Sequence, residues 1–232
     1  MSNCNYKILS IEGNIGSGKS TLLKNIKDKY ESNHNIIFLR EPVDEWDKIR
    51  DKNGSTMLQK FYSNQEKYSF AFQMMAYISR LKILKDAIDS IKDKPGQYII
   101  ITERSLYTDK YVFAKMLYDQ GKIEDVCFQI YNNWFEEFSK NYTIDTIVYV
   151  KTEPQICYER IHKRNRTGEE TIPLSYLNEC NEYHDNFVNN FNNKNNDNNN
   201  NLLIDGNIDI TLYPDELNNW LKKIDELLFM DI

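Results

Sequence analysis

The chain contains little cysteine and no long apolar run. Its 232 residues include only four cysteines, Cys4, Cys127, Cys157 and Cys180, which lie far apart and form no CxxC pair. This pattern indicates neither a disulfide framework nor a zinc site, and it favours a reducing, cytoplasmic compartment. No apolar stretch approaches the roughly 20 residues that cross a bilayer, which argues against a membrane partner. The first strand is expected almost at the start of the chain, which leaves no room for a signal peptide.

An excess of positive charge is also missing. The chain carries 29 lysine and arginine residues against 35 aspartate and glutamate residues, a formal net charge of -6. A nucleic-acid-binding protein that relies on general electrostatics usually has the opposite balance. We therefore expect no nucleic-acid partner, and any anionic ligand must be held by basic residues gathered locally.

Short apolar runs that resemble β-strands alternate with longer stretches of helical spacing. The expected strands are Tyr6–Glu12, Ile36–Leu39, Tyr98–Thr102, Thr146–Val150 and Leu202–Ile204, and the clearest helical stretches are Tyr68–Ile91 and Leu106–Tyr118. This alternation is typical of an α/β protein in which helices cover both faces of a parallel sheet. The length fits a single domain, residues 1–232. The Asn-rich segment 189–201 has almost nothing to bury, so we expect a flexible surface loop there.

A glycine-rich motif directly follows the first expected strand. The sequence GNIGSGKS, residues 13–20, fits the pattern G-x-x-x-x-G-K-[ST] and precedes a stretch of helical spacing. Glycines let backbone N–H groups curl around phosphate oxygens, and the helix N-terminus adds a favourable dipole. A lysine here reaches the β- and γ-phosphates, and the serine hydroxyl suits Mg²⁺. The motif predicts binding of ATP or another nucleoside triphosphate with Mg²⁺, through Gly13, Asn14, Ile15, Gly16, Ser17, Gly18, Lys19, Ser20 and Thr21.

Charged residues follow the second and third expected strands where each strand ends. Glu41 lies in REPVDEW, and Glu103 and Arg104 lie in TERS. In a parallel α/β sheet such positions face the ligand crevice. Glu41 is placed to act as a general base toward a hydroxyl, Glu103 to hold Mg²⁺, and Arg104 to keep Glu41 ionised. Taken alone, Glu41 fits a surface ion pair better, and Glu103 with Arg104 fits a structural pair.

Two helical stretches carry polar residues beside aromatic ones. Gln73 and Arg80, seven residues apart, share a helix face, and so do Asp109 and Phe113, four residues apart. Together with Phe72 they offer what a flat, hydrogen-bonding nucleobase needs. An aromatic stripe at helical spacing is more often part of a core, but polar groups buried beside it favour a binding site.

A basic segment at about residues 160–172 predicts a lid. The sequence RIHKRNRTGEE contains Arg160, Arg164 and Arg166 and a glycine that allows movement. Arginines in a flexible segment are suited to close over transferring phosphate groups. A run of charge is usually a solvated face, so this segment does not establish a lid by itself.

In their order along the chain, these motifs resemble those of the deoxyribonucleoside kinases, especially the deoxyguanosine and deoxycytidine kinase branch. The resemblance covers nearly the whole chain, through IEGNIGSGKST, EPVDEW, MLQKFY, FAFQ, ERSLYTDKYVFAKMLY, IYNNWF and ERIHKRNRTGEETIPLSYL. It implies a P-loop kinase fold with a doubly wound five-stranded parallel sheet in the order 2-3-1-4-5, and a homodimer. It also implies ATP-dependent phosphorylation of the 5′-hydroxyl of a deoxyribonucleoside.

The resemblance also implies a role for each matching residue. Glu41 is similar to the base that takes the proton of the 5′-hydroxyl, Arg104 to its partner, and Glu103 to the acid linked to Mg²⁺. The arginines that match those gripping the donor phosphates are Arg160, Arg164 and Arg166.

On the acceptor side, Tyr62 and Glu169 match the pair that binds the 3′-hydroxyl, with Glu170 as the alternative to Glu169. The Arg80 and Asp109 pair implies purines or cytosine in preference to thymine. The other residues implied at the nucleobase are Gln73 and Phe113, with Trp46, Leu58, Phe61 and Phe72 lining the pocket.

Two other functions stay open at this point. A nucleoside monophosphate kinase of the thymidylate kinase type shares the phosphate loop and the lid, although Glu41 would repel an acceptor that already carries a phosphate. The other alternative is a nucleotide-binding regulatory module without catalysis, although every catalytic position holds a competent residue type. The sequence does not rank deoxyguanosine, deoxyadenosine and deoxycytidine, and it does not identify the phosphate donor that the loop Asp205–Ile210 would contact.

Overall fold

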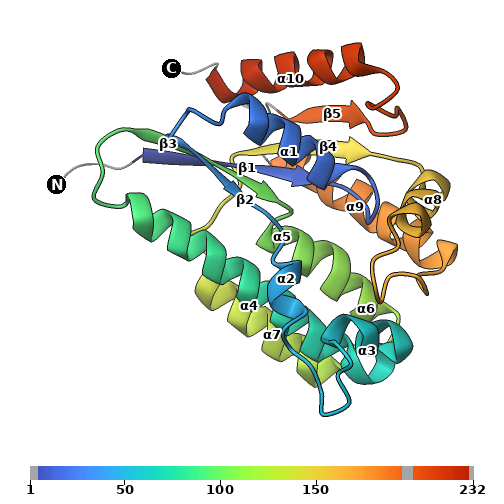
Figure 1. The fold of residues 1–232 in the computed structure, drawn as a ribbon. Helices are drawn as coiled ribbons and strands as arrows, with labels where there is room; N and C mark the ends of the chain where they lie inside the picture. The colour runs from blue at the N-terminus through green and yellow to red at the C-terminus, as the bar shows by residue number, and fades with distance from the viewer. Residues whose placement is uncertain (1–4, 195–200, 230–232) are drawn as a thin grey trace.

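Five parallel strands form one sheet in the computed structural model, which describes residues 5–194 and 201–229. The strand order is β2-β3-β1-β4-β5, as the resemblance implied. Figure 1 shows helices on both faces of the sheet, which confirms the doubly wound α/β class. The strands are β1 (Asn5–Glu12), β2 (Ile36–Leu39), β3 (Gln97–Glu103), β4 (Thr146–Lys151) and β5 (Leu202–Asp205).

Neighbouring residues of the central strands point into two separate hydrophobic clusters, because side chains alternate across a strand. Ile8 and Ile100 pack on one face of the sheet, and Leu9 and Ile101 pack on the other. The strands therefore read as continuous apolar runs, as expected for a sheet covered on both sides. The helices on the Leu9 face are α1 (Lys19–Lys29) and α10 (Pro214–Phe229), and those on the Ile8 face include α4 (Gln65–Ile91), α7 (Asp125–Ser139) and α9 (Leu174–Lys194).

Several shorter helices complete the fold. They are α2 (Val43–Trp46), α3 (Met57–Ser63), α5 (Leu106–Thr108), α6 (Lys115–Asp119) and α8 (Pro154–Arg164). None of the helices in residues 5–194 and 201–229 combines the length and apolarity of a membrane span. Cys127, Cys157 and Cys180 carry free thiols, and Cys4 lies outside the described residues.

The helix expected over Leu106–Tyr118 is present but irregular. A π-helical turn, η1 (Asp109–Ala114), separates α5 from α6. Such wide turns are frequent at functional sites. Asp109 and Phe113 both lie within η1 and are both buried, so the π-helical turn keeps them on the inner side of the segment.

The flexible loop expected over 189–201 is wrong for residues 189–194, which continue helix α9. The helix extends because Phe187 and Phe191, four residues apart, both pack on the core, while Asn189 and Asn190 are exposed. Residues 195–200 lie outside the described part of the chain. Asn201 accepts a hydrogen bond from the Ile147 backbone at 2.7 Å, which attaches the start of β5 to β4.

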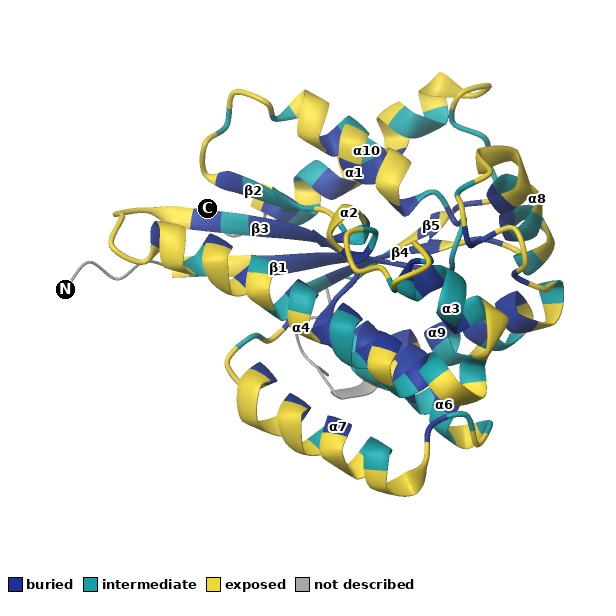
Figure 2. Cartoon of the chain, turned by 60° about the horizontal axis from the view of Figure 1, so that its bottom comes forward, coloured by how far each residue is buried: buried dark blue, intermediate teal, exposed yellow. Residues whose placement is uncertain are grey.

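Helix α7 differs from the other long helices in its exposure. Figure 2 shows a largely exposed helix lying over the lower face of the molecule. Tyr131 and Phe135 are buried on its inner side. Large apolar side chains of α7 nevertheless face outward, namely Val126, Ile130, Trp134 and Phe138.

Candidate active site

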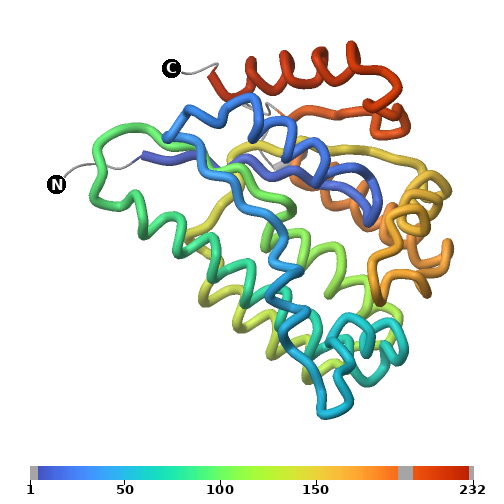
Figure 3. Tube along the Cα trace, viewed as in Figure 1, coloured from blue at the N-terminus to red at the C-terminus, as the bar shows by residue number. Residues whose placement is uncertain are grey.

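The carboxyl ends of β1, β2 and β3 open into a cavity of about 760 Å³. Figure 3 shows the chain turning tightly from β1 into α1, with α8 and the segment after it alongside. Most residues that the sequence predicted for the site line this cavity. They include Lys19, Ser20, Glu41, Glu103, Arg104 and Asp109.

The phosphate loop is packed too tightly for larger residues at two positions. A Cβ on Gly13 would lie 2.5 Å from the Val150 carbonyl oxygen, and one on Gly16 would lie 2.6 Å from the Cys157 carbonyl oxygen. Both glycines also have positive φ, which side chains rarely adopt. Gly13 therefore packs the loop against the end of β4 and Gly16 packs it against α8.

Lys19 is buried within the loop. Its Nζ donates to the Asn14 carbonyl oxygen, and Ser17 Oγ lies 3.4 Å away. Burial, and then the charge of Arg104, lower the pKa of Lys19 to about 7. The Asn14 side chain points away from the cavity and donates to the Leu177 carbonyl oxygen of α9 at 2.8 Å. Asn14 and Ser17 therefore shape the loop, and their side chains do not line the cavity.

Two guanidinium groups hold Glu41 through the same oxygen. Arg104 donates to Glu41 Oε1 at 2.7 Å and Arg80 at 3.0 Å. No described residue donates a hydrogen bond to Oε2, the second oxygen of a side chain that lines the cavity. Burial alone would raise the pKa of Glu41, but the charges of Arg104 and Arg80 outweigh it and hold that pKa at about 2. Glu41 is therefore an ionised and oriented acceptor.

Arg104 has an unusual backbone. Its φ of 62° is in the left-handed region, which costs a residue with a side chain about 1–3 kcal/mol. The Arg104 amide donates to the Ile11 carbonyl oxygen at 3.0 Å, so the strain arises where β3 leaves the sheet. The guanidinium lies 5.1 Å from the centre of the Phe113 ring. This turn lets consecutive residues, Glu103 and Arg104, both line the cavity.

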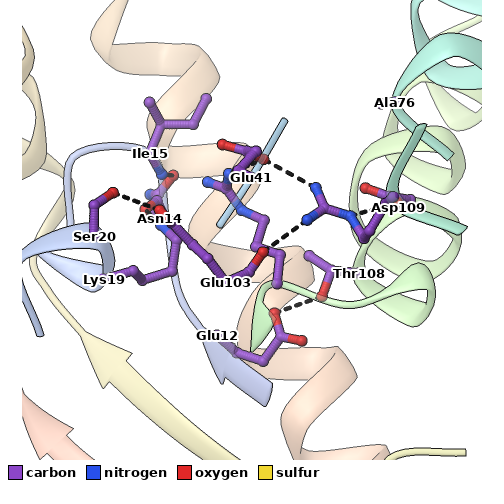
Figure 4. A network of polar contacts seen from close by, with 12 residues as sticks. Glu12, Asn14, Ile15, Lys19, Ser20, Glu41, Ala76, Glu103, Thr108 and Asp109 are labelled. Carbon is purple, nitrogen blue, oxygen red and sulfur yellow. Dashed lines mark hydrogen bonds and ion pairs between the residues drawn. The ribbon is translucent and has the colours of Figure 1, made fainter. Parts of the chain in front are cut away.

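Arg80 connects three parts of the site from behind the cavity wall. Its Nε donates to Asp109 Oδ2 at 2.9 Å, its Nη1 to the Glu103 carbonyl oxygen at 2.7 Å, and its Nη2 to Glu41. Figure 4 shows Glu41, Glu103 and Asp109 around the guanidinium that the dashed contacts join to them. Burial raises the pKa of Asp109 to about 6 although Arg80 opposes it. The sequence placed Arg80 with the nucleobase alone, whereas the structure joins it to Glu41 as well.

The apolar end of the cavity is built by α2, α3 and α4. Phe72 meets Trp46 edge-on at 5.6 Å and stacks on Phe61 at 4.5 Å. Phe61 was expected on the cavity wall but lies behind Phe72 and does not line it. The amide of Gln73 makes no hydrogen bond with any described residue and lines the cavity beside Leu58.

The basic segment predicted as a lid forms ion pairs with a carboxylate of its own. Arg164 and Arg166 both donate to Glu169, the latter at 3.1 Å. Arg160 lies apart from them and donates to the Gly206 carbonyl oxygen at 2.7 Å. Of the two carboxylates left open by the sequence, Glu169 lines the cavity, whereas Glu170 accepts from the Gly168 amide.

Tyr62 lines the same part of the cavity as Glu169. Burial, and then the charge of Glu169, raise the pKa of the Tyr62 hydroxyl well above its usual value. The hydroxyl is therefore a neutral donor, and no described residue occupies it with a hydrogen bond. The two side chains provide a donor and an acceptor that face one space.

The two residues predicted for Mg²⁺, Ser20 and Glu103, lie together in this site. Ser20 Oγ donates to Glu103 Oε1, and both side chains border the phosphate loop. Among the described residues, no group of three or more histidine, cysteine, aspartate or glutamate side chains is placed to hold a metal ion. The protein itself therefore offers a hydroxyl and one carboxylate.

Nearly the whole chain resembles one known protein family. The family model described as deoxynucleoside kinase matches residues 9–228. The chain belongs to the deoxynucleoside kinase family. It is therefore a phosphotransferase that phosphorylates a nucleoside, and neither the monophosphate kinase nor the inactive regulatory module is favoured.

Similar proteins come from viruses and vertebrates. A protein described as a probable deoxycytidine kinase of fowlpox virus is 37% identical over 186 residues, which cover 79% of this chain and 72% of the relative. The mitochondrial deoxyguanosine kinase of Xenopus laevis is 31% identical, with 78% and 73% covered. Human deoxycytidine kinase is 29% identical, with 96% and 91% covered.

Several residues around the site of this deoxynucleoside kinase were not predicted. The cavity is also lined by Lys24, Arg40, Lys163, Asp209 and Thr211. Lys163 stands in the basic lid run, so its charge was a usable signal, and Asp209 stands in the loop expected near the donor. The strained Arg104 backbone had no signal in the sequence. The buried residue Glu12, behind the site, was not predicted either, because its position is that of the last residue of a strand.

Proposed function

We propose that this kinase transfers the γ-phosphoryl group of ATP to the 5′-hydroxyl of a deoxyribonucleoside whose base carries an amino group. The observation that supports this most is the state of Glu41. Both of its guanidinium partners contact Oε1, so Oε2 is left to accept a hydrogen bond from a hydroxyl in the cavity. An alcohol acceptor benefits from such a carboxylate, and a phosphorylated acceptor is repelled by it.

Glu41 acts here by orientation more than by basicity. A carboxylate whose pKa is about 2 does not remove a proton from a free hydroxyl in advance. It holds the hydroxyl in line and takes the proton late, which fits the loose transition state of phosphoryl transfer. Lys19 and the lid residues Arg164 and Arg166 neutralise charge on the transferring phosphate.

We infer that Mg²⁺ accompanies the nucleotide. Ser20 and Glu103, already hydrogen-bonded to each other, fit the ion because Mg²⁺ binds few protein oxygens and completes its shell with phosphates and water. Bound Mg²⁺ supplies charge neutralisation of the phosphate groups.

The polar groups at the far end of the cavity support an amino-bearing base. Asp109 accepts hydrogen bonds there, and the free amide of Gln73 both donates and accepts. Thymine presents a carbonyl oxygen in place of an amino group, and a carboxylate would repel it. The relatives named for deoxycytidine and deoxyguanosine agree with this preference. Tyr62 and Glu169 are placed to bind the 3′-hydroxyl.

Two further properties complete the proposal. The outward apolar side chains of α7 support a homodimer, because Val126, Ile130, Trp134 and Phe138 form one stripe at four-residue spacing. Ile78 on the adjacent α4 is also exposed. The cytoplasmic location stays a prediction from the sequence.

The substitution Glu41→Gln tests the role of the carboxylate. We expect kcat to fall by about 10²–10⁴-fold, since the amide cannot take the hydroxyl proton, while KM for ATP changes little. Glu45→Gln is a matched control, because Glu45 is exposed on the adjoining helix α2 and does not line the cavity. An unchanged kcat in Glu41→Gln would remove this residue from the reaction.

A further inference from the structure

Glu12 is a buried carboxylate that the reaction described above does not use. It ends β1, immediately precedes the phosphate loop, and is fully buried. Ser10 Oγ donates to its Oε1 at 2.7 Å, and Thr108 Oγ1 donates to its Oε2. In residues 5–194 and 201–229, no lysine, arginine or histidine forms an ion pair with it. A carboxylate buried without a cation is costly, so its hydrogen bonds to hydroxyls must hold it.

Thr108, which donates one of the two hydrogen bonds to Glu12, directly precedes the residues proposed to contact the nucleobase. It is the last residue of α5, and the π-helical turn η1 begins at the next position, Asp109. Ser105 caps this short helix, accepting from the Thr108 amide at 3.2 Å, and the Ser105 and Thr108 hydroxyls lie 3.1 Å apart. Thr108 is fully buried, so its hydroxyl has a fixed set of neighbours.

The bond between these residues therefore joins two segments that hold opposite ends of the substrate. Figure 4 shows Glu12, at the end of β1, reaching the Thr108 side chain below Glu41 and Glu103. The β1 end leads into the loop that holds the phosphates. The segment after Thr108 carries Asp109 and Phe113, both on the cavity wall. A deoxynucleoside must contact Asp109 with its base while its 5′-hydroxyl faces the donor, so the distance between the two segments matters.

We propose that Glu12 is a positioning residue, which through Thr108 fixes the start of η1 relative to the phosphate loop and so sets the fit of the nucleobase. This inference rests on the proposed function, since it concerns how that substrate is aligned. Glu12 touches neither substrate nor phosphate. Its effect reaches the reaction through the placement of Asp109 and Phe113.

The test compares two substitutions of one side chain. Thr108→Val keeps the shape and removes the hydroxyl, whereas Thr108→Ser keeps the hydroxyl. We expect Thr108→Val to raise KM for deoxycytidine or deoxyguanosine by about tenfold and to weaken the preference over thymidine, with KM for ATP unchanged. Thr108→Ser should keep both KM for the deoxynucleoside and the preference over thymidine at their wild-type values. Equal KM values and base preference in the two variants would overturn the proposal.

A control separates positioning from general stability. Ser139→Ala removes a buried hydroxyl that pairs with the Tyr77 hydroxyl at 2.9 Å, away from the cavity. We expect it to lower Tm without changing KM for any substrate. A rise in KM for the deoxynucleoside in Ser139→Ala, equal to that in Thr108→Val, would contradict a specific role for Thr108.

Glu12→Gln tests the same bond without Thr108→Val, and an unchanged KM for the deoxynucleoside in this variant would overturn the proposal. Glu12→Gln leaves one acceptor oxygen in place of two, so KM for the deoxynucleoside should rise. In the double variant with Thr108→Val the two effects should not add, because both break the same bond. Full additivity would overturn the proposal. A wild-type chain that phosphorylates no deoxynucleoside would instead refute the proposed function itself.

Discussion

The central ionised side chains of this site hold one another in place. Arg80 is the clearest case, because its three nitrogen groups contact Asp109, the Glu103 backbone and Glu41. A guanidinium presents donors in a rigid fork, so one buried residue can align three others. The burial of Asp109 and Arg80 makes each of them dependent on the other. Asp109, which we propose to read the base, is thus held by the residue that holds Glu41.

Recognition of the base should depend on pH through Asp109. Its pKa is raised to about 6, so it takes up a proton as the pH falls from 7 to 5 and loses an acceptor for the amino group of the base. We expect KM for deoxycytidine to rise by about tenfold at pH 5. Steady-state kinetics across this range measure the effect. Glu41, Arg80 and Arg104 face Asp109 and keep their charges throughout.

The control for this titration is Asp109→Asn, which has no proton to gain. Its KM for deoxycytidine should be raised at every pH, without the further rise below pH 6. An equal rise at low pH in the wild-type protein and in Asp109→Asn would assign the titration to another group.

The raised pKa of Asp109 also affects folding. Between pH 3.8 and 6 the folded chain holds a proton that the unfolded chain has lost, so this stabilisation is full at low pH and disappears as the pH rises through about 6.

Among the elements, the regular ones were predictable and the irregular ones were not. The strands and α4 follow from apolar period and length, since both faces of the sheet are covered. The π-helical turn η1 and the strained turn at Arg104 depend on tertiary contacts, which no local pattern encodes. The extension of α9 through 189–194 overrode the poor helix propensity of asparagine, because Phe191 packs on the core.

Helix α7 gives a prediction at the scale of the element. Trp134→Glu places a charge in the exposed apolar stripe and should separate the dimer into monomers of 27.6 kDa. Light scattering after size-exclusion chromatography measures the mass. Gln129→Lys adds a charge on a different side of the same helix and should leave the dimer intact. A wild-type protein with the mass of one chain would contradict the dimer.

At the scale of the whole molecule, an acidic chain carries basic side chains around its cavity. The net charge is -6, yet the cavity is lined by Lys19, Arg104 and the lid arginines. The sequence anticipated this contrast, because its basic motifs were local while its balance was acidic. The α/β class followed from the alternation of strands and helices, whereas the strand order 2-3-1-4-5 came from the resemblance to a family. The sharing of Arg80 between Asp109 and Glu41 emerged only from the assembled fold.

The most direct test of the account is a rate panel with ATP as donor. It compares deoxycytidine, deoxyguanosine, deoxyadenosine and thymidine with the 5′-monophosphate of each. We predict that at least one amino-bearing deoxynucleoside has a kcat/KM about tenfold or more above that of thymidine and of its own monophosphate. Preferential turnover of the monophosphates would contradict the account, because Glu41 would then face an acceptor that it repels.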